Sequence, residues 1–518
     1  MKFRKLSGVI SLALLPVAAN AQLYQDASNS TAVVVRDPAR QASTEIDAVI
    51  YNPAGTAFLD DGWHFSLNGK VSRRSMVLGY DGYDVTNTAR DILPSVQAAF
   101  KKGKWSFSAS LANEGGYMNW NNGEAPLTSH SFNVSNNRAW SSVVGRYDEL
   151  ATVINDTYEH IGRTTSLTTK DFGISESDML MSRVNCWGDL TNYTLRLGAA
   201  RQFGNFSAYI GIRTNYVTEH TTLGIKRWVE NGEGSISPSM YFSTIAEKTK
   251  SELKAVRNAT ESFFNEHGQT YNMDDYEEVV EDLNKILVEC ANHPDYYEMR
   301  DYPRMNGWGL TPVIGLDYKA GNFNFAVKYE FETKIHTNNG YESFHIPAVL
   351  SGGASWQIMD NLKVAVGGTF THLKTNQQYG HTQSASLKSE YLTFVPNTNA
   401  VVNSEFTTKD DGTSTSFDVS ASVSFSPFKR FLVSLGYTYA SRGLLYKYCY
   451  PQSISGGGNI RADVLSGGFC YQVSDNVKLD FGLSKMLPHS ANYYRGLNFE
   501  KFGDMQTTNV SLGVTVSL

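Results

Sequence analysis

Hydrophobic and polar residues alternate in many short segments between residue 62 and the end of the chain. Residues 477–484 read VKLDFGLS and residues 510–518 read VSLGVTVSL, so every second side chain is apolar. A period of two places the apolar side chains on one face of a β-strand and the others on the opposite face. The alternation therefore predicts amphipathic β-strands rather than helices.

Fourteen such strands can be delimited. The first and the last stand alone, and the other twelve form six pairs that are joined by tight polar turns of a few residues. The predicted strands are 63–72, 95–100, 105–112, 192–200, 206–217, 308–318, 323–331, 347–357, 362–373, 416–425, 431–439, 462–472, 477–486 and 508–518.

Long connections alternate strictly with the short turns, so an antiparallel arrangement places all the long ones at the same end. They span residues 73–94, 113–191, 218–307, 332–346, 374–415, 440–461 and 487–507. Short turns at one end and long loops at the other are typical of outer-membrane barrels, whereas a soluble sandwich does not require them. We therefore expect an all-β membrane protein, a 14-stranded antiparallel outer-membrane β-barrel that is closed because lipid does not tolerate an open sheet edge.

The first 21 residues have the features of a secretory signal peptide. Three cations precede an apolar run at 6–17, and Ala19-Asn20-Ala21 is a cleavage site, so the mature chain is expected to start at Gln22. No later stretch has 18 consecutive apolar residues, so no transmembrane helix is expected. The chain is therefore predicted to be exported, and to cross a membrane with strands if it crosses one.

Charge and composition narrow the class of partner. The formal net charge of −6 becomes −9 when Lys2, Arg4 and Lys5 leave with the signal peptide. An acidic mature chain argues against nucleic acid, because phosphate binding needs a basic surface. Aromatic residues make up 12% of the chain, which favours strands over helices. One disulfide among Cys186, Cys290 and Cys449 is an open alternative, and the fourth cysteine, in an alternating strand, is expected to be packed.

A turn-forming stretch precedes the first predicted strand. Residues 47–59 read DAVIYNPAGTAFL. Pro53 fixes φ and Gly55 tolerates a positive φ, so Asn52-Pro53-Ala54-Gly55 can simply be a turn that leads into the strand. Together with the signal peptide, the fourteen strands and a helical loop, however, the stretch resembles the hatch of the bacterial outer-membrane long-chain fatty-acid and hydrophobic-compound transporter family, where an Asn-Pro-Ala signature lies just before the first barrel strand.

The resemblance implies an arrangement and a function. Residues 22–61 would form a hatch inside a barrel made by residues 62–518, with gating at Asn52, Pro53, Ala54 and Gly55. It also implies passive transport of long-chain fatty acids or other hydrophobic molecules through a surface groove, an internal apolar pocket and a hatch movement. Burial of each methylene of such a substrate is worth about 0.8 kcal/mol.

Two further features are candidates for a role in transport. In the resembled family a kink in the third strand opens the wall sideways, and Gly115 and Gly116 can form such a break or a plain turn. Residues 243–292 are predicted to form two helices, each with an apolar face. The two helices are either a solvent-exposed hairpin without a binding role or the walls of a surface groove that binds apolar substrate. The groove residues would be Leu253, Val256, Phe263, Tyr276, Leu283 and Ile286.

Charged residues on the polar faces of the strands are expected to form ion-pair networks in the lumen, although one or two of the cations can instead hold a substrate carboxylate. They are Arg196, Arg213, Lys328, Glu330, Lys363, Asp418, Lys478 and Asp480. The sequence contains no zinc motif, no nucleophile elbow and no P-loop, so no catalytic residue, metal or cofactor is predicted.

The resulting prediction is a non-enzymatic, monomeric multi-pass β-barrel in the cell outer membrane of a Gram-negative bacterium. Its expected partners are hydrophobic small molecules such as long-chain fatty acids, detergent-like lipids and outer-membrane lipid. Two alternatives remain: a non-transporting surface barrel whose loops bind external partners, and an outer-membrane lipid hydrolase that uses residues such as His372 and Ser420, which fall on predicted strands.

Overall fold

The structure is a computed structural model of the whole chain. The residues that it describes are 31–80, 83–117, 126–232, 234–268, 296–299, 305–337, 344–373, 387–388, 401–402, 414–442, 460–487 and 501–518. The predicted signal peptide and the second predicted helix, with Tyr276, Leu283 and Ile286, lie outside these residues.

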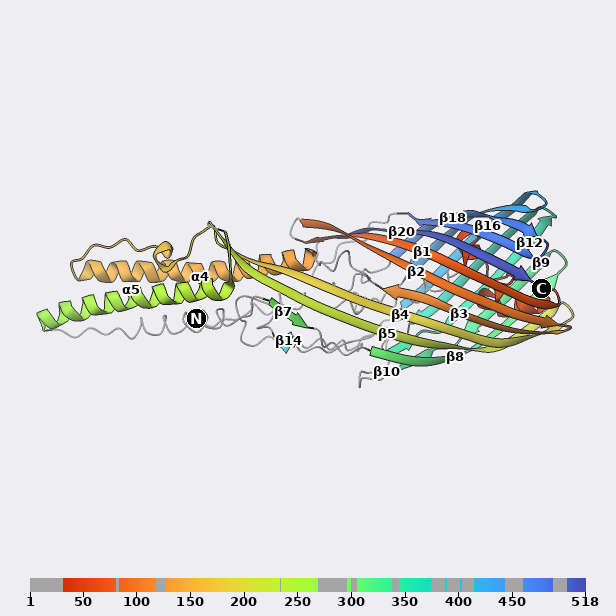
Figure 1. Cartoon of the computed structure of the whole chain (residues 1–518), viewed down its shortest axis with the longest axis horizontal. Helices are drawn as coiled ribbons and strands as arrows, with labels where there is room; N and C mark the ends of the chain where they lie inside the picture. Colours follow the sequence, from red (N-terminus) through yellow and green to blue (C-terminus); the bar gives the residue numbers. More distant parts are fainter. Residues whose placement is uncertain are drawn as a thin grey trace.

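One large antiparallel sheet closes on itself as a barrel (Figure 1). Its fourteen long strands are β1 (Gly62–Tyr80), β2 (Tyr83–Lys102), β3 (Trp105–Tyr117), β4 (Met179–Phe203), β5 (Phe206–Asn231), β8 (Met305–Ala320), β9 (Phe323–Glu330), β12 (Val349–Met359), β13 (Leu362–Leu373), β16 (Ser414–Phe428), β17 (Phe431–Arg442), β18 (Ile460–Ser474), β19 (Val477–Met486) and β20 (Lys501–Ser517).

Each of these strands pairs with the next one in this order, and β20 pairs with β1 from His64↔Ser517 to Gly79↔Lys501. Beyond the ladder, the backbones of Trp63 and Leu518 exchange two hydrogen bonds of 2.9 and 2.7 Å. The last residue of the chain therefore helps to close the barrel, and the predicted 14-stranded fold is confirmed.

The alternation in the sequence separates the two faces of the wall. On β1, Trp63 and Leu67 are 49% and 59% exposed, whereas Ser66 and Asn68 are 5% and 3% exposed. Burial of the polar side chains and exposure of the apolar ones is the reverse of a soluble protein. It is the arrangement of a barrel whose outer surface contacts lipid and whose inner surface is polar.

Several strands extend far beyond their predicted ends. The connection predicted at 73–94 is mostly a continuous hairpin of β1 and β2, and β4 and β5 contain 25 and 26 residues. A strand needs only about 9–11 residues to cross a membrane. The outer parts of these strands lack the alternating pattern because they lie beyond the lipid, so periodicity could not reveal them.

Short strands extend the same sheet at the end where the long connections lie. They are β6 (Gly234–Ile236), β7 (Tyr296–Met299), β10 (Thr333–Thr337) and β11 (Phe344–Ile346), while β14 (Leu387–Lys388) and β15 (Val401–Val402) pair only with each other.

Two long helices project from the long-connection end of the barrel, beyond β4 and β5 (Figure 1). They are α4 (Pro126–His160) and α5 (Pro238–His267), and the one-turn helix η5 (Thr169–Phe172) packs against both. Helix α5 agrees with the first helix predicted in 243–292, whereas α4 lies in the long connection 113–191, for which no helix is predicted. No helix among the described residues is long and apolar enough to span a membrane.

The core of this helical projection joins two connections that are distant in sequence. Tyr147 and Ile154 of α4 and Phe242 and Ile245 of α5 are each fully buried in one cluster. The Tyr147 hydroxyl lies 3.2 Å from Thr249 Oγ1, and burial raises the pKa of Tyr147 to about 12. The polar composition of 113–191 concealed α4, because this helix exposes a polar face and buries only a narrow apolar stripe.

Candidate functional site in the barrel lumen

Residues 31–61, called here the luminal segment, lie inside the barrel. The segment contains α2 (Ala32–Arg36), α3 (Ala48–Tyr51) and the 3₁₀ helix η3 (Pro53–Phe58), which are almost entirely buried. Helix α2 contacts β17 to β20 and β1, whereas η3 contacts β2 to β5, β8 and β9. A buried segment that touches opposite sides of a closed wall fills the lumen between them (Figure 1).

Asn52 anchors this segment to the wall through its side-chain amide. Its Nδ2 donates to the backbone oxygen of Ser43, at 2.8 Å, and to the carboxylate of Asp317 on β8. The same carboxylate oxygen accepts a second bond from Asn324 on β9, at 2.9 Å. Asn52 and Asp317 are each 1% exposed, and Oδ1 of both has no hydrogen-bond partner among the described residues. The anchor therefore holds the segment without satisfying every polar atom.

The next residues of the motif follow from local geometry. Pro53 begins η3, where its fixed φ suits a first helical turn and its missing N–H is not needed. At Gly55, a Cβ atom would lie 2.5 Å from Nδ2 of Asn52 and even closer to the backbone oxygen of Ser43. Only glycine leaves room for the bond between Asn52 and Ser43. Asn-Pro-Ala-Gly is therefore a compact anchor and not only a turn.

Ala54 brings the backbone of the motif directly against the wall. Its side chain is fully buried with Tyr209 and Val313, and its carbonyl accepts a bond of 2.7 Å from the Ser207 hydroxyl on β5. Nearby, Lys328 on β9 donates a bond of 2.8 Å to the carbonyl of Ile50. The part of the segment around Asn52 is thus attached to β5, β8 and β9.

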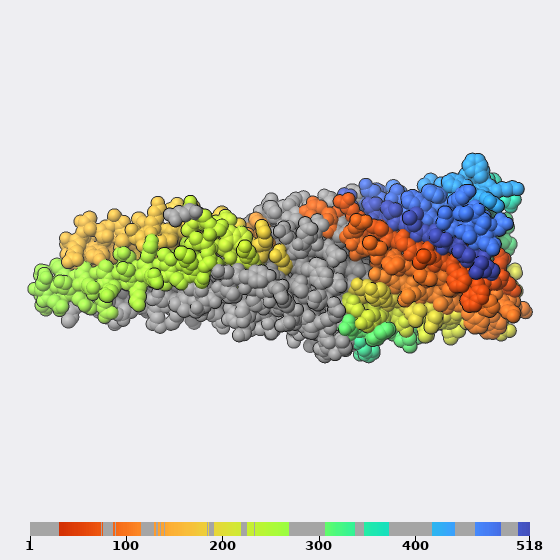
Figure 2. Space-filling model, viewed as in Figure 1, coloured from red at the N-terminus to blue at the C-terminus, as the bar shows by residue number. Residues whose placement is uncertain are grey.

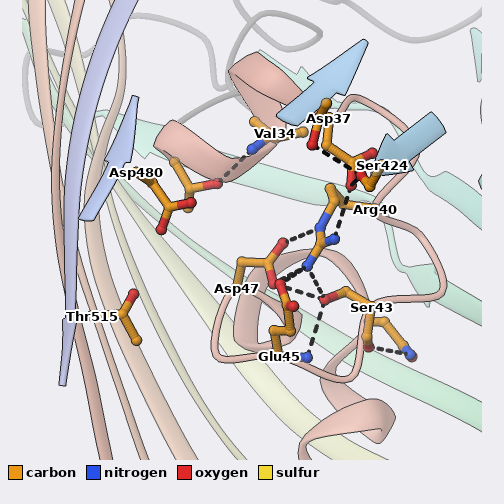
Figure 3. A network of polar contacts seen from close by, with 12 residues as sticks. Val34, Asp37, Arg40, Ser43, Glu45, Asp47, Ser424, Asp480 and Thr515 are labelled. Atoms are coloured by element: carbon orange, nitrogen blue, oxygen red, sulfur yellow. Dashed lines mark hydrogen bonds and ion pairs between the residues drawn. The ribbon is translucent and has the colours of Figure 1, made fainter. Parts of the chain in front are cut away.

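Arg40 holds the luminal segment together from within (Figure 3). Its guanidinium binds Asp47 through two bonds of 2.7 and 2.8 Å, Asp37 at 3.1 Å and Glu45 at 2.5 Å. The charge of Arg40 lowers the pKa of the Glu45 carboxyl well below its usual range. Burial alone would lower the pKa of Arg40, but Asp47 and Glu45 outweigh it and raise that pKa well above its usual value.

The other part of the segment binds the opposite side of the barrel. Arg36 donates to Asp480 on β19 at 2.9 Å and to Ser434 on β17 at 2.6 Å, and Asp37 accepts a bond from the Ser422 hydroxyl on β16. Arg40 contacts both Asp37 and Asp47, so it connects the part held by β16 to β19 with the part that leads to Asn52.

Wall glycines let the segment approach these strands very closely. At six positions an added Cβ would lie 3.0 Å or less from an atom of the luminal segment: Gly353, Gly367, Gly436, Gly468, Gly482 and Gly513. Distances below 3.0 Å essentially never occur for a real Cβ atom, so larger residues would require the segment to shift. The contact between wall and segment is consequently free of intervening side chains at these points.

Ion pairs lie on the polar inner face of the wall at several of the predicted positions. Arg213 pairs with Glu330, Lys328 pairs with the same carboxylate at 2.7 Å, and Arg196 pairs with Glu114. All five side chains are less than 10% exposed. Burial of charges is costly unless they are paired, so the network explains how the wall tolerates them.

Gly115 and Gly116 lie inside β3 at an irregularity of the sheet. The register of β3 against β4 shifts between Asn113 and Gly116, as in a β-bulge. On the other side, pairing of β3 with β2 ends at Ser95↔Ala112, although β2 continues to pair with β1 up to Tyr83. The glycines therefore do not form a plain turn, and the ladder between β2 and β3 is open beyond Ala112.

The predicted groove residues on α5 are not an open surface. Val256 is fully buried in the core that α5 shares with α4, and Leu253 packs against this core. Phe263 is half-buried and stacks on His267, with ring centroids 4.3 Å apart. The apolar face expected to be free is covered by α4, whose presence the sequence did not reveal.

The candidates for other chemistry do not come together. Ser420 is opposite Gly367 and His372 is opposite Thr415, so the two lie five positions apart and on opposite faces of neighbouring strands. They cannot act as a nucleophile and its base. Among the described residues, no group of three or more metal-ligating side chains could hold a metal ion. Cys470 is free, and Cys186 lies within β4 rather than in a loop.

Solved structures with a similar fold include two variants of a monoaromatic hydrocarbon channel. The TodX deltaS2S3 mutant, a monoaromatic hydrocarbon channel, has a TM-score of 0.51 and 13% identity, with 94% of this chain and 99% of that chain covered. The TodX deltaS2 mutant has a TM-score of 0.50 and 14% identity, with 95% and 100% covered. A FadL homologue from Pseudomonas aeruginosa has a TM-score of 0.49 and 11% identity, with 94% and 98% covered.

No protein-family model matches the sequence, and no curated protein sequence matches it. The structural likeness covers almost the full length of both chains at low sequence identity. The chain therefore has the fold of these channels, as its resemblance to the hydrophobic-compound transporter family implied.

Proposed function

We propose that the protein is a passive outer-membrane channel for hydrophobic molecules. The observation that carries this proposal is the luminal segment, which lies across the lumen. On the side of β5, β8 and β9 it is held by the Asn52 and Ala54 contacts and by bonds from Lys328 to Ile50 and from Asn324 to Ala42. If the luminal segment were only a permanent plug, no path for a molecule around it would be needed. The fold, however, is shared with monoaromatic hydrocarbon channels, which favours a segment that can move. Outer-membrane placement follows from the apolar exterior of the barrel and its polar lumen.

The mechanism begins with capture of an apolar molecule at the long-connection end, followed by transfer into an apolar pocket. Residues 52–55 then act as the gating part of the hatch. Release of the bond from Asn52 to Asp317 frees this part of the segment from β8, and release of the bond from Ser207 to the Ala54 carbonyl frees η3 from β5. The Arg36 and Arg40 contacts keep the remainder of the segment in place. The movement is small and needs no energy source, because the gradient of substrate drives net flow.

We assign the exit or entry through the wall to the open ladder between β2 and β3. A bulge changes the direction of a strand and interrupts pairing. Gly115 and Gly116 have no side chains that could block the gap between β2 and β3. A molecule that leaves sideways stays in an apolar environment, which avoids the cost of exposing it to water.

The substrate class that we propose is long-chain fatty acids or other hydrophobic compounds, among which monoaromatic hydrocarbons are named for TodX. Saturable binding of a labelled long-chain fatty acid to the purified, folded barrel tests this class. Competition by other long-chain acids supports fatty acids, and competition by toluene alone supports small hydrocarbons. Absence of binding by either in a folded sample contradicts the proposal.

A second candidate function, a surface barrel whose projection binds an external partner, is favoured by one observation. Helices α4 and α5 form their own hydrophobic core and extend far from the wall (Figure 2). Replacing residues 126–160 and 238–267 by short linkers separates the two functions. Loss of uptake in this variant supports a role in capture, whereas unchanged uptake with loss of surface binding supports the second function.

A further inference from the structure

A row of positively charged residues crosses four neighbouring strands of the wall. Lys485 of β19 is opposite Thr508 of β20, Thr508 is opposite Arg73 of β1, and Arg73 is opposite Arg90 of β2. We call these four residues the outer cationic row. Neighbouring strands are about 4.8 Å apart, so the three cations fall within about 15 Å along the sheet.

These side chains point away from the lumen. On β1, Arg73 shares its face with Leu67, which is 59% exposed, whereas the neighbour of Arg73, Ser72, is 5% exposed. On β2, Arg90 likewise shares its face with Ile92, which is 67% exposed. Arg73, Arg90 and Lys485 are themselves exposed. The row is therefore on the outer surface of the barrel, where strands β1, β2 and β20 lie side by side (Figure 1).

The row lies at the upper edge of the apolar belt. Arg73 is ten residues beyond Trp63 along β1. At about 3.3 Å per residue and a strand tilt of about 40°, this separation is about 25 Å along the barrel axis. The apolar band of such barrels has the same height. The outward residues ten positions along β5 and β8, counted from Phe206 and Tyr318, are Tyr216 and Trp308. Cations thus replace the aromatic residues of this level on one side of the barrel.

The arrangement is unfavourable unless an anion is present. Arg73 and Arg90 are directly opposite in an antiparallel pair, where like charges destabilise the sheet. Neither they nor Lys485 forms an ion pair with a carboxylate among the described residues. The acid on the outward face of β18, Asp463, accepts the hydroxyl of Tyr437 instead.

We propose that the outer cationic row binds the phosphate group of a phosphorylated glycolipid in the outer leaflet of the outer membrane. The two guanidinium groups offer planar sets of donors that match phosphate oxygens, Lys485 adds a point charge, and the Thr508 hydroxyl can donate a further bond. The acyl chains then lie along the apolar residues directly below the row, which are Val71, Ile92, Leu483 and Val510. The inference rests on the outer-membrane placement proposed above, but not on transport.

The test measures lipid binding by the full-length, detergent-folded protein in native mass spectrometry. The probes are lipid A, its dephosphorylated form, phosphatidylglycerol and inorganic phosphate. The variant combines Arg73→Gln, Arg90→Gln and Lys485→Gln. The matched control is Arg201→Gln, which removes an outward cation at the opposite end of the wall, where Arg201 stacks over Trp105 at 5.1 Å.

The expected result is at least tenfold weaker lipid A binding by the triple variant and unchanged binding by the Arg201→Gln control. Removal of the phosphate from lipid A is expected to weaken binding to the unaltered protein by a similar factor. That second comparison needs no variant, so it stands even where the triple variant does not fold.

Three results overturn the proposal. They are equal lipid A binding by the triple variant, equal affinity of the unaltered protein for phosphatidylglycerol, and displacement of lipid A by an equimolar amount of inorganic phosphate. Fatty-acid binding by the same samples distinguishes this failure from failure of the channel proposal, because the row lies on the outer surface and the hatch lies in the lumen.

Discussion

Asn52 holds the luminal segment through one amide group that donates to Ser43 and to Asp317. Replacing it by alanine removes both bonds and leaves a buried carboxylate with one donor fewer. A hydrogen bond to a charged group contributes about 1.5–3 kcal/mol, so Asn52→Ala is expected to change uptake of a labelled long-chain fatty acid several-fold. We expect the barrel to remain folded, because the Asn52 amide makes no other bond to the wall among the described residues. An unchanged shift in electrophoretic mobility between unheated and heated samples checks this. Unchanged uptake contradicts a role of Asn52 in the hatch.

Gly55 offers an independent test of the same anchor, because a Cβ there collides with the two atoms that form the bond between Asn52 and Ser43. Gly55→Ala is expected to reproduce the uptake phenotype of Asn52→Ala without altering any polar group. Gly69→Ala is the matched control, since a Cβ at that position on β1 meets no atom within 4 Å. Equal uptake by the two alanine variants argues against the steric anchor.

We expect Glu45 to make the order of the luminal segment depend on pH. Its carboxyl has a lowered pKa beside Arg40, so its contribution is complete above the ordinary glutamate pKa of about 4.3 and is lost as the pH falls toward the lowered value. Hydrogen exchange of residues 36–50, corrected for intrinsic rates, is therefore expected to be constant from pH 8 to about 5 and to accelerate at lower pH. In Glu45→Gln, this acceleration is expected to be smaller. A pH response identical to that of the unaltered protein rules out Glu45 as its source.

At the scale of single elements, β3 contains one residue more than β4 between Asn113 and Gly116. Deleting Gly115 removes the extra residue and restores a regular register, which strengthens the wall where we place the lateral route. We expect uptake to fall at least tenfold while fatty-acid binding persists, because capture precedes exit. Deletion of Gly103, in the turn between β2 and β3, serves as a control for loss of one residue. Normal uptake after Gly115 deletion excludes the lateral route at this site.

Helix α5 depends on α4 for its stability. Val256→Asp places a charge in the shared core, and we expect it to cost more than about 3 kcal/mol and to abolish the helical signal in circular dichroism. Ala255→Asp is the matched control, because the adjacent side chain is exposed. The barrel is expected to remain folded in both variants, since this core includes only the outer ends of β4 and β5, at Leu180 and Val229. Retention of helix in Val256→Asp contradicts the packing of α4 on α5.

Strands that contact lipid on one face and the lumen on the other could be predicted from the sequence. Strands outside the membrane, and helix α4, could not. The ends of β19, Val477 and Met486, agree with the predicted 477–486, because alternation covers the whole strand. In β4, periodicity identified 192–200 but missed the outer part from Met179 onward. From Met179 to Asp189 the strand pairs with β5 but not with β3, and we expect no lipid boundary there to impose a period of two.

At the scale of the whole molecule, the sequence indicated the luminal site but not its connections. Asn52 and Gly55 were identified from turn chemistry and resemblance, yet Asp317, the partner of Asn52, lies 265 positions away along the chain. Asp317 is the one acidic residue of β8, which makes it a candidate, but the local pattern does not show that it faces residue 52. The same holds for Arg40, whose three acidic partners surround it only after the segment has folded within the barrel.

The close contact between wall glycines and the luminal segment also determines the electrical behaviour of the barrel. The diameter of a barrel grows with its number of strands, so fourteen strands without a plug enclose more space than their own side chains fill. With α2 against Gly482, where a Cβ would lie 2.7 Å from the Ala32 carbonyl oxygen, and η3 against the opposite strands, we expect that space to be closed to ions. A planar bilayer that contains the protein is expected to show no ionic current through it. Gly482→Leu is expected to displace α2 and to produce stepwise increases in conductance. An insulating barrel of this kind can admit oily molecules without giving polar toxins an aqueous path.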